Sequence, residues 1–239
     1  MKKLCLLLTI ALLLTSLAAC TPKDNDLSGQ PQATSTTKDL SHLPTPEPYP
    51  PLATTAKPVI YFYPTSTTDV HVTLDYDGEL TCTYPAYADG WHVTAHPDGT
   101  LHDASGMTYN YLYWEGVTDA EYDFSTGFCV PGEDTAAFLE DALEKLGLTR
   151  REANEFIVYW LPLMEANPYN LIAFQADAYT DHAELSVTPA PDTLIRVFMA
   201  WQPLDAAVDI APQTLDAPAR EGFTVVEWGG AQIGTGAEK

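Results

Sequence analysis

Short runs of β-branched and aromatic residues recur from residue 59 to residue 228, and turn-forming residues separate them. Such runs favour β-strands over helices. The run 70–76 alternates apolar and polar residues, as a strand with one buried face does. Trp91 to Ala95 and the segment from Leu101 flank Asp98-Gly99, a pair that predicts a two-residue hairpin loop. The other expected strands are 59–63, 109–114, 156–161, 171–174, 183–188, 194–201 and 223–228.

One stretch instead carries the apolar spacing of an α-helix, with Asp134 or Thr135 as its N-cap and Gly147 as its C-terminal stop. Its apolar residues are Phe138, Leu139, Ala142, Leu143 and Leu146. Thr149 and Glu152 then have the spacing of a capping box, which predicts a second, short helix. Residues 156–161 either continue that helix or form a strand, and their Ile, Val, Tyr and Trp content favours a strand. The sequence therefore predicts an α+β fold, mainly antiparallel β and sandwich-like, with a helical insertion around 134–155.

The first residues have the pattern of an export signal. Lys2 and Lys3 precede an apolar run that ends in small residues, and the segment 4–19 is shorter than the ~20 residues of a membrane-spanning helix. Leu17-Ala18-Ala19-Cys20 matches the lipobox of bacterial lipoproteins, which implies cleavage after residue 19 and lipid attachment at Cys20. The alternative is an ordinary signal peptide followed by a chance cysteine. Several acyl chains at one cysteine would anchor the chain stably to a membrane.

The next segment, 20–56, is predicted to be a disordered tether. Residues 21–56 contain seven Pro and a single aromatic residue, too little apolar surface to offset the entropy of ordering. Alternatively, 44–51 packs on the domain as a polyproline arm. We expect one globular domain over 57–230 and a flexible tail over 231–239.

The charge balance excludes several partners. The chain has 33 Asp and Glu against 11 Lys and Arg, a net charge of -22, and residues 57–239 hold 29 acidic and 7 basic residues, so the acidity belongs to the domain. Nucleic acids and anionic lipid head groups are bound through clustered Lys and Arg, which this chain lacks. We therefore expect no nucleic-acid partner.

Four segments resemble an uncharacterised bacterial lipoprotein family, and related domains occur in hypothetical fungal proteins. They are Lys57-Pro58-Val59-Ile60-Tyr61-Phe62-Tyr63-Pro64, Tyr111-Leu112-Tyr113-Trp114-Glu115, Phe156-Ile157-Val158-Tyr159-Trp160-Leu161-Pro162 and Phe223-Thr224-Val225-Val226-Glu227-Trp228-Gly229-Gly230. The resemblance covers nearly all of 57–230. It implies the domain limits and a place outside the cytoplasm, and it carries no activity.

Two cysteines fall within the domain. In an exported protein, Cys82 and Cys129 predict a disulfide. The alternatives are two buried free thiols or, less favoured, a metal or catalytic role. The sequence leaves this choice open.

Histidines and carboxylates cluster in places that invite a metal. With Asp98-Gly99 as the hairpin loop, His92 and His96 share a sheet face with Asp103 while His102 points to the other face, so a three-histidine site fails. Calcium is a weaker alternative at two acidic clusters, Asp75-Asp77-Glu79 and Asp119-Glu121-Asp123. We therefore predict no metal and no cofactor, with calcium as the exception to test.

Charged residues beside tryptophans are the remaining candidates. Glu115 follows Trp114 and Glu227 precedes Trp228, so this pair of carboxylates would suit a glycoside hydrolase. Arg196 lies in an otherwise apolar run, where a charge is costly unless paired, so it binds either an internal carboxylate or an anionic ligand. Arg196, Trp114 and Trp228 are the predicted ligand-binding residues, and Glu115 and Glu227 the weaker catalytic candidates.

These observations favour a membrane-anchored, extracytoplasmic lipoprotein with a non-catalytic domain that binds a ligand or an envelope partner, such as a glycan or a protein. One alternative is a carboxylate-dependent hydrolase of cell-wall or dietary glycan. The other is a structural or assembly protein of the cell envelope. The sequence contains none of the common hydrolase or phosphate-binding motifs.

Overall fold

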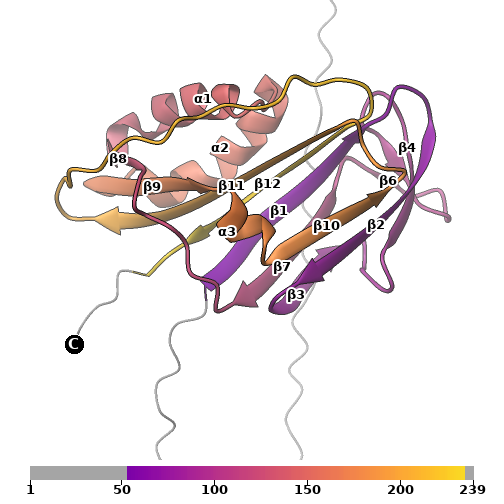
Figure 1. The fold of residues 1–239 in the computed structure, drawn as a ribbon, viewed down its shortest axis with the longest axis horizontal. Helices are drawn as coiled ribbons and strands as arrows, with labels where there is room; N and C mark the ends of the chain where they lie inside the picture. The colour runs from indigo at the N-terminus through magenta and orange to yellow at the C-terminus, as the bar shows by residue number, and fades with distance from the viewer. Residues whose placement is uncertain (1–52, 235–239) are drawn as a thin grey trace, which may run out of the picture. The chain divides into compact units, whose positions relative to one another are not determined.

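The computed structural model describes residues 53–234, which form two β-sheets and a layer of helices (Figure 1). The large sheet has seven strands in the order β3-β7-β1-β12-β11-β9-β8, and the small sheet has five in the order β10-β2-β4-β5-β6. The bounds in the large sheet are β3 Glu79–Tyr84, β7 Leu112–Thr118, β1 Ala53–Tyr63, β12 Thr224–Gln232, β11 Thr193–Leu204, β9 Tyr169–Gln175 and β8 Phe128–Pro131. Those in the small sheet are β10 Ala183–Thr188, β2 Thr68–Tyr76, β4 Trp91–Ala95, β5 Leu101–His102 and β6 Thr108–Tyr109.

Every strand pair is antiparallel except β11 with β12, which run parallel. A parallel pair needs a connection that returns along the sheet, and here that connection is the strap, residues 205–223. The strap crosses the helix side of the large sheet (Figure 1), where Leu215 packs against the core. The predicted α+β, sandwich-like fold is confirmed, with the helices added as an outer layer.

The helices follow β8 directly. A short η1 (Gly132–Asp134) leads into α1 (Thr135–Lys145), then α2 (Arg150–Met164), and a small α3 (Asp177–Thr180) follows β9. The predicted helix stop is confirmed, because Gly147 has φ of 83°. The predicted capping box is also present: Thr149 accepts from the Glu152 amide, and the Glu152 side chain accepts from Thr149.

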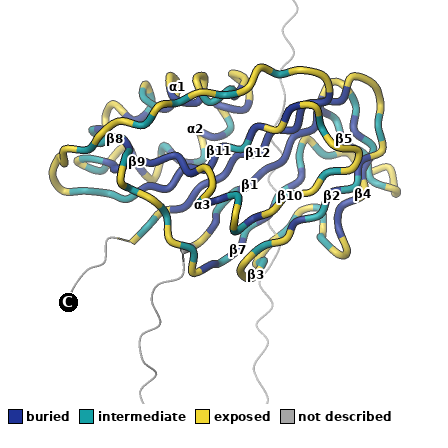
Figure 2. Tube along the Cα trace, viewed as in Figure 1, coloured by how far each residue is buried: buried dark blue, intermediate teal, exposed yellow. Residues whose placement is uncertain are grey.

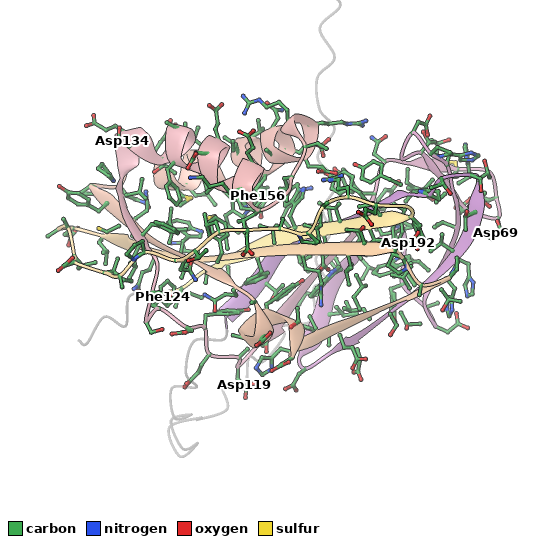
Figure 3. The ribbon with its side chains drawn as sticks, turned by 45° about the horizontal axis from the view of Figure 1, so that its top comes forward. Asp69, Asp119, Phe124, Asp134, Phe156 and Asp192 are labelled. Atoms are coloured by element: carbon green, nitrogen blue, oxygen red, sulfur yellow. The ribbon has the colours of Figure 1, made fainter. Side chains whose placement is uncertain are left out.

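The strand expected over 156–161 is wrong, because these residues belong to α2. The buried residues of α2 include Ala153, Phe156, Trp160 and Met164, whose spacing forms one helical stripe. That stripe outweighs the β-propensity of the single residues. Phe156, labelled in Figure 3, lies on the sheet side of this helix.

The large sheet separates two hydrophobic cores. One core lies between the sheet and the helices, and the other lies between the two sheets. β1 shows the division: Val59 and Tyr61 face the helices, whereas Ile60 and Phe62 face the small sheet. In Figure 2 most residues of β1, β11 and β12 are therefore buried. A sheet buried on both faces gives a closely packed support to the side chains that project from it.

The domain limits differ from the expected ones. β1 begins at Ala53, within the predicted tether, and β12 runs to Gln232, within the predicted tail, where Ala231 is fully buried. The predicted signal peptide, Cys20 and the rest of the tether lie outside the described residues. No helix within 53–234 is both long and apolar enough to cross a bilayer.

The hairpin between β4 and β5 has a three-residue loop, Pro97-Asp98-Gly99, and the predicted two-residue loop is wrong. The His96 amide donates to Thr100 O, and Gly99 has φ of 89°, so the loop is a turn closed by a left-handed residue. Thr94 therefore faces His102, and Ala95 faces Leu101. The shift by one residue places Leu101 in the core and turns His102 to the face that carries His92 and His96.

Candidate functional site

The backbone of β1 is irregular at Lys57. The strand's register shifts between Ala56 and Val59 against β12, and between Thr55 and Val59 against β7. Lys57 has φ of 61°, and no other non-glycine residue within 53–234 has a positive φ. A lysine in the left-handed region costs about 1–3 kcal/mol, and such strain concentrates at functional sites. After the bulge, the Lys57 side chain lies on the helix side of the sheet, the same side as Val59 and Tyr61.

The Lys57 ammonium sits among aromatic rings from three elements. Its Nζ lies 5.1 Å from the centroid of Tyr111 and 5.2 Å from that of Tyr113. Tyr159 of α2 lies at 5.9 Å, and Trp228 of β12 at 6.0 Å. Each ring is close enough to attract the cation through its quadrupole. Sheet and helix together thus hold one charge at a fixed place.

Lys57 is also unusual among the cations of this acidic domain. Of the six Lys and Arg within 53–234, five have a carboxylate oxygen within 4.0 Å, and Lys57 is the exception in that range. Its backbone amide donates to Glu115 Oε1 at 3.3 Å, which fixes the bulge but leaves the ammonium free. The ammonium therefore retains hydrogen-bond donors for a ligand.

A cavity of about 410 Å³ opens at this ammonium. Its lining is half aromatic or apolar and half polar, and consists of Lys57, Asn110, Tyr111, Glu155, Val158 and Tyr159. We call it the Lys57 pocket. Its size is within the range of small-molecule sites, and it combines flat apolar surface with a few polar groups, as such sites do.

Tyrosines hold the carboxylates near the pocket. Tyr61 Oη donates to Glu155 Oε2 at 2.8 Å, and burial together with Glu155 raises the pKa of Tyr61. Burial and the Glu115 carboxylate raise the pKa of Tyr113 in the same way. Both phenols therefore stay protonated at neutral pH, and they remain donors. The two phenols therefore hold the carboxylates of Glu155 and Glu115 in place as hydrogen-bond acceptors.

The predicted pair of catalytic carboxylates is not assembled. Glu115 lies on the helix-side face of the large sheet with Tyr113, whereas Glu227 is fully buried between the two sheets. Two residues on opposite faces of one sheet cannot flank a single glycosidic bond. The hydrolase prediction for Glu115 and Glu227 is therefore wrong for this pair.

Arg196 and Trp114 bind Glu227, so their predicted role toward a ligand is wrong. Arg196 Nε lies 2.7 Å from Glu227 Oε2, and Trp114 Nε1 donates to Glu227 Oε1 at 3.1 Å. The Arg196 side chain is 8% exposed and that of Glu227 is 0% exposed. Burial opposes the charge on Arg196, yet attraction to Glu227 raises its pKa overall. Of the predicted ligand residues, only Trp228 lies near the pocket, as a buried ring 6.0 Å from the Lys57 ammonium that is not part of the lining.

The predicted disulfide between Cys82 and Cys129 is also wrong. Both thiols are free, and Cys82 lies on β3 whereas Cys129 lies on β8, at opposite edges of the large sheet. Adjacent strands are ~4.8 Å apart, so the two edges are far beyond the ~7 Å that a disulfide spans. Neither thiol is buried, because Cys82 is exposed and Cys129 is partly so.

No group of three or more His, Cys, Asp or Glu converges on one point within the described part of the chain. Two of the acidic residues expected around calcium have other partners: Asp123 accepts from Ser125 within its turn, and Asp77 pairs with His182 at 3.2 Å. Calcium binding stays a prediction that this geometry does not support.

Comparison with protein-family models, with curated proteins and with solved structures finds no match to this chain. The site therefore rests on its geometry. Sequence reasoning missed Lys57 and Tyr159 as site residues. Lys57 carried one signal, a charged residue before Pro58 at the start of an apolar strand, and Tyr159 was hidden because 156–161 was expected to be a strand.

Proposed function

We propose that this chain is a lipid-anchored, extracytoplasmic binding protein whose non-catalytic domain holds a sugar ring of an envelope glycan in the Lys57 pocket. The observation that carries the ligand site is Lys57 itself. It is a strained residue whose ammonium is caged by rings and, within 53–234, is the one cation without a carboxylate partner.

The chemistry of the pocket suits a sugar ring. Tyr111 and Tyr159 are partly exposed, and their flat faces are able to stack on the C–H face of a pyranose. Lys57 donates hydrogen bonds, Glu155 accepts them, and Asn110 does both, which matches a ring of hydroxyl and acetamido groups. A polyanion fits poorly, because the chain carries a net charge of -22.

The location is supported by the lipobox at Leu17-Ala18-Ala19-Cys20. Growth with labelled palmitate tests it: the wild-type chain should take up label in the membrane fraction, and Cys20→Ala should take up none. Equal labelling of both would exclude anchoring at Cys20.

Soluble fragments of cell-wall glycan are the probe for the pocket, with calorimetry as the readout and the chain from residue 21 as the sample. We expect binding by the wild type, and at least about a tenfold loss, or 1.4 kcal/mol, in Lys57→Met and in Tyr159→Ala. Lys145→Met is the matched control, because Lys145 pairs with Asp141 outside the pocket. Binding that is absent in the wild type, or equal in Lys57→Met, would remove the glycan proposal. Cleavage of the bound glycan would replace the binding role with the hydrolase role.

A further inference from the structure

The outer face of the small sheet brings together four histidines, His71 on β2, His92 and His96 at β4, and His102 on β5. Asp69, labelled in Figure 3, marks this face on β2. The face belongs to neither core and lies on a different sheet from the Lys57 pocket. The histidines form two pairs with different geometry, and the difference determines which pair is able to bind a metal.

In the first pair, His96 Nε2 and His102 Nδ1 share a hydrogen bond of 3.0 Å, and the two rings are perpendicular, with an interplanar angle of 90°. Two imidazole nitrogens at ~2.0–2.1 Å from one ion are ~2.9 Å apart at a right-angled coordination, and ~3.3 Å apart at a tetrahedral one. The two nitrogens are thus already as close as two adjacent ligands of a square-planar or tetragonal ion, and such an ion would take the place of the hydrogen bond between them.

The surroundings of this pair fit a metal ligand set. Thr67 Oγ1 lies 3.1 Å from His96 Nδ1, so the hydroxyl is placed to accept that N–H and leave Nε2 unprotonated for a metal. A cavity of about 390 Å³ adjoins both rings, lined by His96, Pro97, Asp98, Thr100 and His102, with room for water as the remaining ligands. The domain's negative charge also attracts a divalent cation.

We propose that His96 and His102 form a two-histidine site for Cu²⁺. Imidazole nitrogen at tetragonal geometry suits Cu²⁺, which also binds most tightly among the divalent first-row ions. Each ring keeps one proton on its far nitrogen, so binding moves a proton within a ring and releases none from neutral imidazole. The site depends on the three-residue hairpin loop, because a two-residue loop would turn His102 away.

The second pair of histidines lies on the same face of the small sheet and provides a control for copper binding by the first pair. His71 and His92 lie directly opposite each other, and their rings stack at 4.0 Å with an interplanar angle of 9°. Lone pairs of imidazole lie in the ring plane, so two parallel rings point them along parallel lines and do not converge on one ion. His92→Gln should therefore leave copper binding unchanged.

Copper titration followed by calorimetry and electron paramagnetic resonance tests the site. All samples begin at residue 21 and carry His42→Gln, Cys82→Ser and Cys129→Ser, because other imidazoles and thiols bind or reduce Cu²⁺. Far-ultraviolet circular dichroism verifies that each variant is folded. We expect one Cu²⁺ per chain with hyperfine splitting from two nitrogens, and at least about a tenfold weaker affinity in His96→Gln and His102→Gln.

Three results would overturn the proposal. Copper affinity unchanged in both His96→Gln and His102→Gln would place the ion elsewhere. An equal loss in His92→Gln would indicate diffuse binding over the face. Tighter binding of Zn²⁺ than of Cu²⁺ would refute the tetragonal assignment. None of these results bears on the Lys57 pocket, because its residues belong to the helix side of the large sheet.

Discussion

Arg196 and Lys57 are both cations on the large sheet, each near a glutamate and an aromatic ring, yet their surroundings differ. Arg196 lies between the two sheets, almost fully buried and paired with Glu227. Lys57 lies on the helix side, at a bulge, with its ammonium facing rings and a cavity. The comparison teaches that a charge in an apolar run points to a ligand only when the protein itself leaves it unpaired.

Arg196→Met should give the largest effect, because it leaves Glu227 buried without its partner. Removing one member of a buried ion pair costs about 3–5 kcal/mol. Urea denaturation followed by circular dichroism measures the loss. Arg196→Met with Glu227→Gln should recover much of it, and Arg150→Met, which breaks the exposed pair with Glu140, should cost at most about 1 kcal/mol. A loss below 1 kcal/mol in Arg196→Met would contradict the structural role.

Arg220→Met extends the comparison to an intermediate case. Arg220 is 26% exposed and bonds to the buried Glu152 and to Gly147 O, which holds the strap on the helices. Glu152 keeps its bonds from Tyr63 and Thr149, so we expect a smaller loss of about 1–3 kcal/mol. Limited proteolysis should also cut faster within 205–223. Unchanged proteolysis would show that Arg220 does not hold the strap.

Alkaline pH tests the buried surroundings of Arg196 through Tyr179. The Tyr179 ring lies 4.7 Å from the Arg196 guanidinium carbon. Burial, then Glu227, raises the pKa of Tyr179 well above 10.0. The unfolded chain releases this proton above pH ~10 and the folded chain does not, so stability is full below pH 10 and falls by up to about 1.4 kcal/mol per pH unit above it. Tyr61 and Tyr113 contribute to the same slope, so Tyr179→Phe should reduce it by the share of one tyrosine. Identical alkaline unfolding midpoints in the wild type and in Tyr179→Phe would contradict a raised pKa for Tyr179.

The smallest effect on stability is expected for Lys57→Met. The substitution removes cation–π attraction worth about 0.5–1 kcal/mol and keeps the apolar stem, so the urea midpoint should hardly move. Glycan affinity should fall in the same sample. A stability loss as large as that of Arg196→Met would mean that Lys57 is a structural residue, and the contrast between Lys57 and Arg196 would no longer hold.

Most of the fold follows from patterns that the sequence displays, and the errors have identifiable causes. The expected strand 109–114 is wrong as a single strand, because it is divided between β6 in the small sheet and β7 in the large sheet. The expected strands other than 109–114 and 156–161 exist because β-propensity and burial agree there. In α2 they disagree: Ile157, Val158 and Tyr159 favour a strand one by one, but Phe156, Trp160 and Met164 are buried at helical spacing. Local propensity is weaker than a shared apolar face, so the helix prevails.

The hairpin error was avoidable, because Trp91, Val93, Ala95 and Leu101 are all apolar and must share the buried face. Only a loop that sets Ala95 opposite Leu101 achieves this. The site was less accessible to sequence reasoning. The φ of Lys57, and the position of Tyr159 and Trp228 around its ammonium, depend on how helix, sheet and bulge pack, and no local pattern encodes that.

The place of β1 has a mechanical consequence for a chain held by its N-terminal end. β1 is the first strand, yet it lies inside the large sheet with β7 and β12 on its two sides. A pull on the preceding segment acts along β1, and the ladder bonds on both sides run across that direction. They must therefore be sheared together and cannot open one after another. If the chain is tethered as proposed, drag on a bound glycan is carried by a strand that is hydrogen-bonded on both sides, and the bulge at Lys57 is the first irregularity along it.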